Sequence, residues 1–210
     1  MSNIVNESIN AYIEKQYQED DPVLLEMENY GKERNFPLVG PQVGRLLFIL
    51  TRVLMAKSVF EMGSGYGYSA YWFAKALPQR GKVYQTENLQ KNSKKAREFF
   101  EKGGLEEKAE FLVGDALELI DRVPGDFDII FLELQKEDYT TAFSKAKKRL
   151  VPGGLLIADN PLWFGRVLET SQDPETLGIQ KFTQLLFTDP GFNATILPIR
   201  DGVAIGYKKP

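Results

Sequence analysis

The 210-residue chain contains no cysteine and no histidine. Without cysteine it has no disulfide framework, no thiolate zinc site and no thiol nucleophile. Without histidine it also lacks the commonest general base, so acid–base or metal chemistry would fall to carboxylates, lysine, tyrosine and amides. Such groups favour hard, oxygen-binding cations over zinc.

The sequence also lacks a strong net charge and a long apolar run. Its formal charge is −3 at pH 7, which gives no overall attraction to a polyanion, so nucleic acid is not the expected partner. No apolar run approaches the length of a membrane span, and the polar residues 1–10 contain no signal-peptide core. We therefore expect a cytoplasmic protein that does not contact a membrane.

A glycine-rich turn between an apolar strand and a helix is the most informative stretch. Within residues 58–69 the strand ends on Glu61, and glycine then occupies every second position, at Gly63, Gly65 and Gly67. Glycine lets the backbone turn sharply and lets a ligand approach the free N–H groups at the start of a helix. The same pattern could instead be only a tight turn.

Two acids favour a nucleoside ligand at this turn. Glu61 precedes the glycines and could meet a cationic amino group, while Glu87 ends the next strand, where an acid accepts ribose hydroxyls. The order Glu-x-Gly-x-Gly-x-Gly differs from the GxGxxG of dinucleotide sites. It suits a cationic amino-acid nucleoside, and S-adenosylmethionine is such a molecule.

The alternation of apolar runs and breakers predicts an α/β fold with a doubly wound, mostly parallel seven-stranded sheet and an antiparallel C-terminal strand, the Rossmann-like methyltransferase fold. We expect one domain over residues 1–210, in which residues 1–37 form a helical cap. Strands are expected over residues 58–62, 82–87, 109–113, 127–134, 154–159, 194–199 and 202–208. Helices are expected within 8–35 and over 41–55, 68–77, 89–102, 115–122 and 139–150, with 161–188 as a connection that covers an aromatic acceptor.

In such sheets the ligand lies beyond the carboxyl ends of the strands. Glu133, Asp159 and Asn160 end two adjacent central strands, and two carboxylates with an amide oxygen would make a site for a hard cation. Ordinary surface polarity is the alternative explanation. Asp115 follows another strand, where it could cap a helix or accept a hydrogen bond from an adenine amino group.

Four stretches of the chain carry a family pattern, and they include Val-Phe-Glu-Met-Gly-Ser-Gly-Tyr-Gly-Tyr-Ser-Ala and Ile-Ala-Asp-Asn-Pro-Leu-Trp-Phe-Gly. These stretches resemble the cation-dependent catechol and caffeoyl-CoA O-methyltransferase family and its bacterial members. They are residues 59–70, 127–139, 150–167 and 196–203, and the resemblance extends over residues 38–208. It implies an S-adenosylmethionine-dependent enzyme that methylates a hydroxyl of a small aromatic molecule. We also expect a homodimer.

The resemblance further implies roles for individual positions. The implied cofactor-binding residues are Val39, Glu61, Gly63, Ser69, Glu87, Asp115, Ala116 and Glu133. Glu133, Asp159 and Asn160 would hold Mg²⁺ or Mn²⁺, or else Ca²⁺, and Lys136 would take or steer the proton of the acceptor hydroxyl. Without the resemblance, Lys136 would be interpreted as a solvated lysine ahead of a helix.

The chain departs from the family where the first metal ligand is expected. Glu133-Leu134-Gln135-Lys136 stands where the family usually has Asp-Ala-Asp-Lys, so one ligand arm is a methylene longer and one carboxylate is an amide.

One alternative function is therefore a binding module that keeps the cofactor but has lost metal and activity. Another is a methyltransferase for hydroxylated uridine in transfer RNA, suggested by two basic helices that carry Lys91, Lys94, Lys95 and Arg97, and Lys145, Lys147, Lys148 and Arg149.

Overall fold

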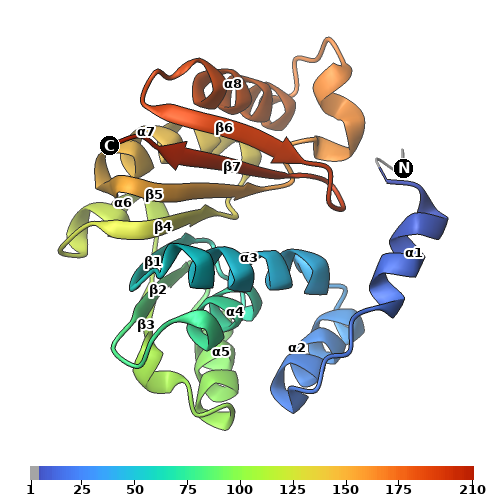
Figure 1. The fold of residues 1–210 in the computed structure, drawn as a ribbon, viewed down its shortest axis with the longest axis vertical. Helices are drawn as coiled ribbons and strands as arrows, with labels where there is room; N and C mark the ends of the chain where they lie inside the picture. The colour runs from blue at the N-terminus through green and yellow to red at the C-terminus, as the bar shows by residue number, and fades with distance from the viewer. Residues whose placement is uncertain (1–4) are drawn as a thin grey trace.

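The computed structural model describes residues 5–210, so residues 1–4 of the predicted cap lie outside it. The strands are β1 (Ser58–Met62), β2 (Lys82–Glu87), β3 (Ala109–Val113), β4 (Phe127–Leu132), β5 (Leu150–Asp159), β6 (Phe192–Leu197) and β7 (Val203–Lys208). They form a seven-stranded sheet in the order β3-β2-β1-β4-β5-β7-β6 (Figure 1). The β1–β2, β2–β3, β1–β4 and β4–β5 pairs are parallel, and β7 runs antiparallel to β5 and β6. The predicted sheet is thereby confirmed.

Helices cover both faces of this sheet. The α-helices are α1 (Glu7–Lys15), α2 (Pro22–Glu33), α3 (Gly40–Leu54), α4 (Tyr68–Ala76), α5 (Gln90–Lys102), α6 (Ala116–Arg122), α7 (Tyr139–Arg149) and α8 (Pro174–Thr188). Three short 3₁₀ helices are η1 (Glu106–Lys108), η2 (Lys136–Asp138) and η3 (Trp163–Leu168). Figure 1 shows α3, α4 and α5 on one side of the sheet and α6, α7 and α8 on the other.

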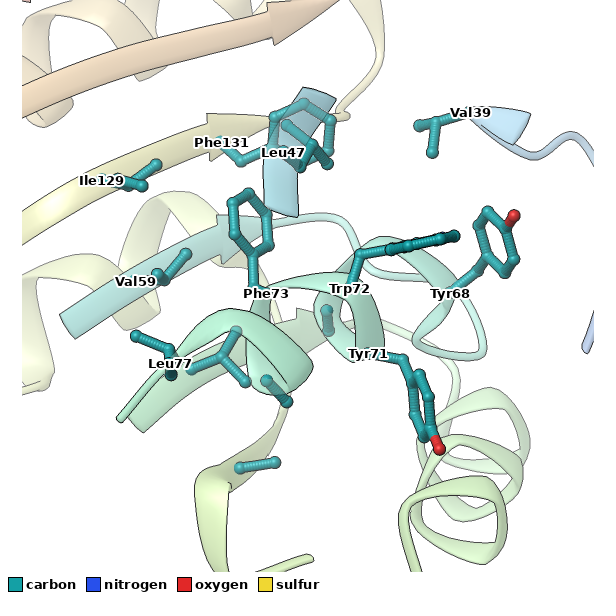
Figure 2. Close-up of a cluster of buried hydrophobic side chains, with 14 of the residues drawn as sticks. Val39, Leu47, Val59, Tyr68, Tyr71, Trp72, Phe73, Leu77, Ile129 and Phe131 are labelled. Carbon is teal, nitrogen blue, oxygen red and sulfur yellow. The ribbon is translucent and has the colours of Figure 1, made fainter. Parts of the chain in front are cut away.

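The central strand β4 explains why two helical layers are needed. Ile129 and Phe131 belong to one buried cluster, and Ile130 and Leu132 belong to a second cluster on the opposite face. Successive side chains of a strand point to opposite faces, so a strand that is apolar throughout must be covered on both sides. Figure 2 shows the first cluster, in which the ring of Phe73 from α4 lies 5.8 Å from the ring of Phe131, centroid to centroid.

The N-terminal helices attach to the body in different ways. α2 buries Leu24 and Met27, and it accepts a hydrogen bond from the Tyr66 hydroxyl at the Met27 carbonyl, at 2.9 Å. α1 buries none of its residues, and the Gln42 amide of α3 donates to its Asn10 side chain at 2.7 Å. Polar contacts therefore hold α1, whereas apolar packing holds α2.

The prediction for residues 161–188 was wrong, because this segment contains α8. Asp173 caps this helix by accepting a hydrogen bond from the Thr176 N–H at 2.9 Å, and Ile179, Phe182 and Leu186 are buried at helical spacing. The cap and the spacing are visible in the sequence. The strand predicted over 127–134 also ends earlier, at Leu132, so Glu133 lies just beyond the strand.

Within residues 5–210, no helix combines the length and the apolar character that a membrane crossing requires.

Candidate functional site

A cavity of about 990 Å³ lies at the carboxyl ends of the parallel strands, where the sequence predicts a ligand. A smaller hollow of about 250 Å³ adjoins it and shares Gly63, Glu87, Glu133 and Gln135 with it. Of the predicted site residues, Gly63, Glu87, Asp115, Ala116, Glu133, Lys136, Asp159 and Asn160 line the cavity, and Val39 and Ser69 line the smaller hollow. The structure therefore brings ten of the eleven predicted residues to one connected space.

The glycine turn needs its glycines for steric reasons. Gly63, Gly65 and Gly67 have φ values of +87°, +54° and +86°, which side chains disfavour. A Cβ at position 63 would lie 2.4 Å from the Glu133 carbonyl oxygen, and one at position 65 would lie 2.7 Å from the Phe36 ring. The tight turn is thus real, and it also forms one wall of the smaller hollow.

Glu61 is the predicted residue that does not reach the cavity surface. Its side chain is fully buried and accepts a hydrogen bond from the Ser69 hydroxyl, and Ser69 in turn lines the smaller hollow. Burial raises the pKa of Glu61 from 4.5 to about 8. Its Oε2 atom has no hydrogen-bond partner within residues 5–210, so a donor is missing next to this carboxyl group.

Two further acids lie at the ends of β2 and β3. Glu87 accepts hydrogen bonds at Oε1 from the Leu89 N–H, at 2.8 Å, and from the Asn92 amide, at 3.3 Å. These bonds fix the carboxylate at the rim of the cavity. Asp115 caps α6 by accepting a hydrogen bond from the Leu117 N–H at 2.8 Å, which confirms the capping interpretation for one of its oxygens while the residue still lines the cavity.

Glu133 and Asp159 form a pair of carboxyl groups on the cavity wall. Burial raises the pKa of both groups, and the charge of Glu133 raises the pKa of Asp159 further. The two carboxyl groups shift each other's pKa, and Glu133 Oε2 has no hydrogen-bond partner among the described residues. Two like charges held this close need a proton or a cation between them.

This donor set fits a hard divalent cation. Asn160 follows Asp159 directly and lines the same cavity, so two carboxyl groups and an amide are present on its wall. Across residues 5–210, no group of three or more His, Cys, Asp or Glu residues is arranged to hold a metal. A cation site at this place would therefore depend on the amide as its third protein ligand.

Lys136 is buried, so the solvated-lysine interpretation was wrong. Its side chain is only 5% exposed, although it begins the short helix η2. The ammonium nitrogen Nζ donates to the Tyr139 hydroxyl at 2.7 Å and to the Asp159 carbonyl oxygen at 3.2 Å. Its positive charge lowers the pKa of both Glu133 and Asp159 against the effect of burial.

A strained loop forms the opposite wall. Trp163, Phe164 and Gly165 follow one another with φ values of +46°, +55° and +83°. Asp201, at the tip of the β6–β7 hairpin, accepts a hydrogen bond from the Phe164 N–H at 2.7 Å and so holds this loop in place. Trp163 Nε1 is buried without a hydrogen-bond partner in the described part of the chain. Such strain concentrates at functional sites.

Sequence reasoning missed two contributors to the cavity. The first is Arg200, which lines the cavity, has a φ of +52° and donates from Nη1 to the Leu38 carbonyl at 2.6 Å. It thereby ties the hairpin to the segment before α3. The second contributor is α1, from which Glu7, Asn10 and Ala11 line the cavity. No local motif indicates either role, because both depend on contacts between distant segments.

The two basic helices, α5 and α7, begin next to this cavity. None of the eight cationic side chains that suggested an RNA acceptor lines it. On α7, Lys145 pairs with Asp121 and Lys147 pairs with Asp189, while Arg149 donates to backbone carbonyls. These contacts support the interpretation of these residues as ordinary surface cations.

Comparison with known proteins agrees with this geometry. The family model described as O-methyltransferase matches residues 14–209. Catechol O-methyltransferase of Niastella koreensis is 32% identical over 221 residues, covering 100% of both chains. Caffeoyl-CoA O-methyltransferase 2 of Populus trichocarpa is 29% identical over 175 residues, covering 77% of this chain and 71% of its own. The crystal structure of the O-methyltransferase TomG from Streptomyces achromogenes, in complex with SAM (S-adenosylmethionine), has a TM-score of 0.89 and 25% identity, covering 97% of this chain and 96% of its own.

Proposed function

This chain belongs to the O-methyltransferase family, and on that premise we propose that it transfers a methyl group to a hydroxyl of a small catechol-like or hydroxycinnamoyl acceptor with the help of a divalent cation. It is an S-adenosylmethionine-dependent O-methyltransferase. The observation that carries the acceptor assignment is the buried Lys136, which lies beside the Glu133–Asp159 pair on the wall of a cavity that is also lined by Trp163.

In this proposal the smaller hollow and the adjoining part of the cavity hold the cofactor. Glu87 accepts hydrogen bonds from the ribose hydroxyls with Oε2, since only Oε1 is used by the Leu89 N–H and the Asn92 side-chain amide. Glu61 supplies the negative charge for the amino group, acting through or beside Ser69. Val39, Gly63, Asp115 and Ala116 complete the walls.

The cation would be held by Glu133, Asp159 and Asn160. When bound, it would lower the pKa of an acceptor hydroxyl that it touches. The longer side chain of Glu133 suits a tolerant coordination shell, so Mn²⁺ or Ca²⁺ is as well suited as Mg²⁺.

The protein's own task is to align the acceptor and to manage one proton. The sulfonium methyl group is already electrophilic, so the acceptor oxygen must be held in line with the methyl–sulfur bond. Lys136 Nζ takes or steers the hydroxyl proton, and its burial keeps it from rotating into solvent. Trp163 and Phe164 provide apolar surface for an aromatic ring.

We also propose that the chain works as a single domain and as a homodimer in the cytoplasm. α3 and the residue that follows it leave three apolar side chains more than half exposed, at 55%, 76% and 80%. They are Ile49, Val53 and Met55. A second copy of the chain is the proposed cover for this face, and light scattering of the purified protein measures whether the dimer forms.

A methyl-release assay against three acceptor classes, with and without divalent cation, tests this function. We expect turnover of catechols or hydroxycinnamoyl thioesters that depends on the cation. Turnover restricted to transfer RNA would mean that the acceptor is RNA and not a small aromatic molecule. Tight cofactor binding without turnover of any acceptor would favour the binding-module alternative.

A further inference from the structure

The hydroxyl of Tyr139 is buried beneath Lys136, in a position that the proposed reaction does not use. Tyr139 is the first residue of α7 and has no exposed surface. Its ring packs edge-on against Phe182 of α8 at 5.3 Å between centroids. The hydroxyl oxygen lies 3.0 Å from the carbonyl oxygens of both Leu132 and Asp159, which end β4 and β5. It therefore lies between the ends of the two strands that precede the carboxylate pair.

The direction of the hydrogen bonds at this hydroxyl is determined by its neighbours. A phenol keeps its proton at neutral pH, because its ordinary pKa is about 10. Carbonyl oxygens only accept, so the Tyr139 proton must go to Leu132 or to Asp159. Its oxygen is then left to accept from Lys136 Nζ at 2.7 Å.

This arrangement fixes the orientation of the Lys136 nitrogen. Nζ has four tetrahedral positions. Its own Cε occupies one, and the hydrogen bonds to the Tyr139 oxygen and the Asp159 carbonyl oxygen use two more. One position is therefore left for another partner. Nζ lies 5.9 Å from the centroid of the Trp163 ring, across the cavity that both residues line.

The backbone of Lys136 is also packed closely, against helix α8. A Cβ at Gly178 of α8 would lie 2.4 Å from the Lys136 carbonyl oxygen and 2.7 Å from the Glu137 Cα. α8 therefore packs directly on η2, which only a glycine allows at this position. The same helix supplies Phe182 to the Tyr139 ring.

We propose that Tyr139 is a positioning residue for methyl transfer. Its hydroxyl holds the Lys136 nitrogen so that the fourth tetrahedral position around Nζ faces the acceptor oxygen. The proposal rests on the proposed role of Lys136, but it concerns orientation, and Tyr139 itself touches neither cofactor nor acceptor. Loss of its hydroxyl frees the amine to rotate, and misalignment of this kind is expensive in catalysis.

Tyr139→Phe tests the proposal because it removes one oxygen and keeps the ring. We expect kcat to fall about 10- to 100-fold, while KM for the acceptor and the affinity for S-adenosylmethionine change less than about twofold. Tyr71→Phe is the matched control, since it removes a hydroxyl from another buried tyrosine, away from the cavity. We expect that control to leave kcat unchanged.

A double-mutant cycle separates positioning from general damage. In a Lys136→Met background there is no amine to orient, so Tyr139→Phe should cause no further loss of kcat. An equal loss in both backgrounds, or no loss in the unmodified background, would overturn the proposal. Full activity of Lys136→Met alone would instead remove the proposed role of Lys136, a failure that this cycle identifies separately.

A measurement on the unsubstituted enzyme covers the case in which Tyr139→Phe does not fold. With ¹³C-labelled lysine, NMR relaxation should report a rigid ε-methylene group for Lys136. The ε-methylene group of Lys148, an exposed lysine of α7, should be mobile. Equal mobility of the two side chains would overturn the proposal.

Discussion

The two sides of the cavity are built in different ways. The glycine-loop side consists of the turn with Gly63, Gly65 and Gly67 and of the acid Glu87, all within 25 residues of sequence. The hairpin side combines Lys136, the loop at 160–165, the β6–β7 tip and α1. The backbone conformation of one local turn shapes the glycine-loop side. Side chains from distant segments of the chain build the hairpin side. A local motif can therefore specify the first side but only parts of the second.

The largest expected effect lies on the hairpin side. Lys136→Met should lower kcat by about 10²–10⁴-fold, the range for loss of a general base, with cofactor affinity unchanged. Steady-state kinetics and calorimetry measure the two quantities. Lys148→Met, which alters an exposed lysine on α7, is the control, and we expect no effect from it. Full turnover by Lys136→Met would place the reaction's proton transfer elsewhere.

On the glycine-loop side, Glu87→Ala should weaken S-adenosylmethionine binding by about 1–3 kcal/mol, the scale for charge-assisted hydrogen bonds. Its effect on kcat at saturating cofactor should be small. This outcome would sharpen the contrast with Lys136, because one substitution acts on binding and the other on turnover. Unchanged affinity in a folded Glu87→Ala protein would remove Glu87 from the cofactor site.

Glu61 gives the glycine-loop side a pH dependence. Because its pKa is about 8 when folded against 4.5 ordinarily, the folded state holds the extra proton between these values. The contribution of this group to the free energy of unfolding is therefore largest below pH 4.5 and falls as the pH rises toward 8.

The cofactor should show the opposite trend. In the proposed site its cationic amino group is bound by the ionised carboxylate, so affinity should rise between pH 6 and pH 8, by at most about tenfold per pH unit for one proton. Glu61→Gln should flatten both profiles, which thermal melts and calorimetry across this range would measure. A slope that persists in Glu61→Gln must come from other groups.

The smallest effect concerns Arg200 on the hairpin side. Arg200→Gly relieves a left-handed backbone strain of about 1–2 kcal/mol and loses a hydrogen bond worth about 1 kcal/mol. The free energy of unfolding should therefore change by less than about 1 kcal/mol, while KM for the acceptor rises because the hairpin is no longer tied to Leu38. Chemical denaturation and kinetics test this pair of results. A large loss of stability would mean that Arg200 holds the fold.

Much of this architecture could be predicted because it depends on local rules. Strand alternation, the glycine turn and polar residues at strand ends predicted the sheet and six of the lining residues, whereas Val39, Ser69, Ala116 and Lys136 came from the family resemblance. The helix α8 was missed even though Asp173 and Pro174 mark its start. The partners of Lys136 could not be predicted, because Tyr139 and Asp159 meet it only through tertiary contacts. The same holds for Arg200, whose partner Leu38 is 162 residues away in sequence.

A crystal structure with S-adenosylhomocysteine, a divalent cation and catechol would show where each of the three ligands binds. We expect the nucleoside against Gly63 and Glu87, the cation on Glu133, Asp159 and Asn160, and a catechol oxygen within hydrogen-bonding distance of Lys136 Nζ. A catechol bound outside this cavity, or one whose hydroxyls point away from Lys136, would contradict the proposed function.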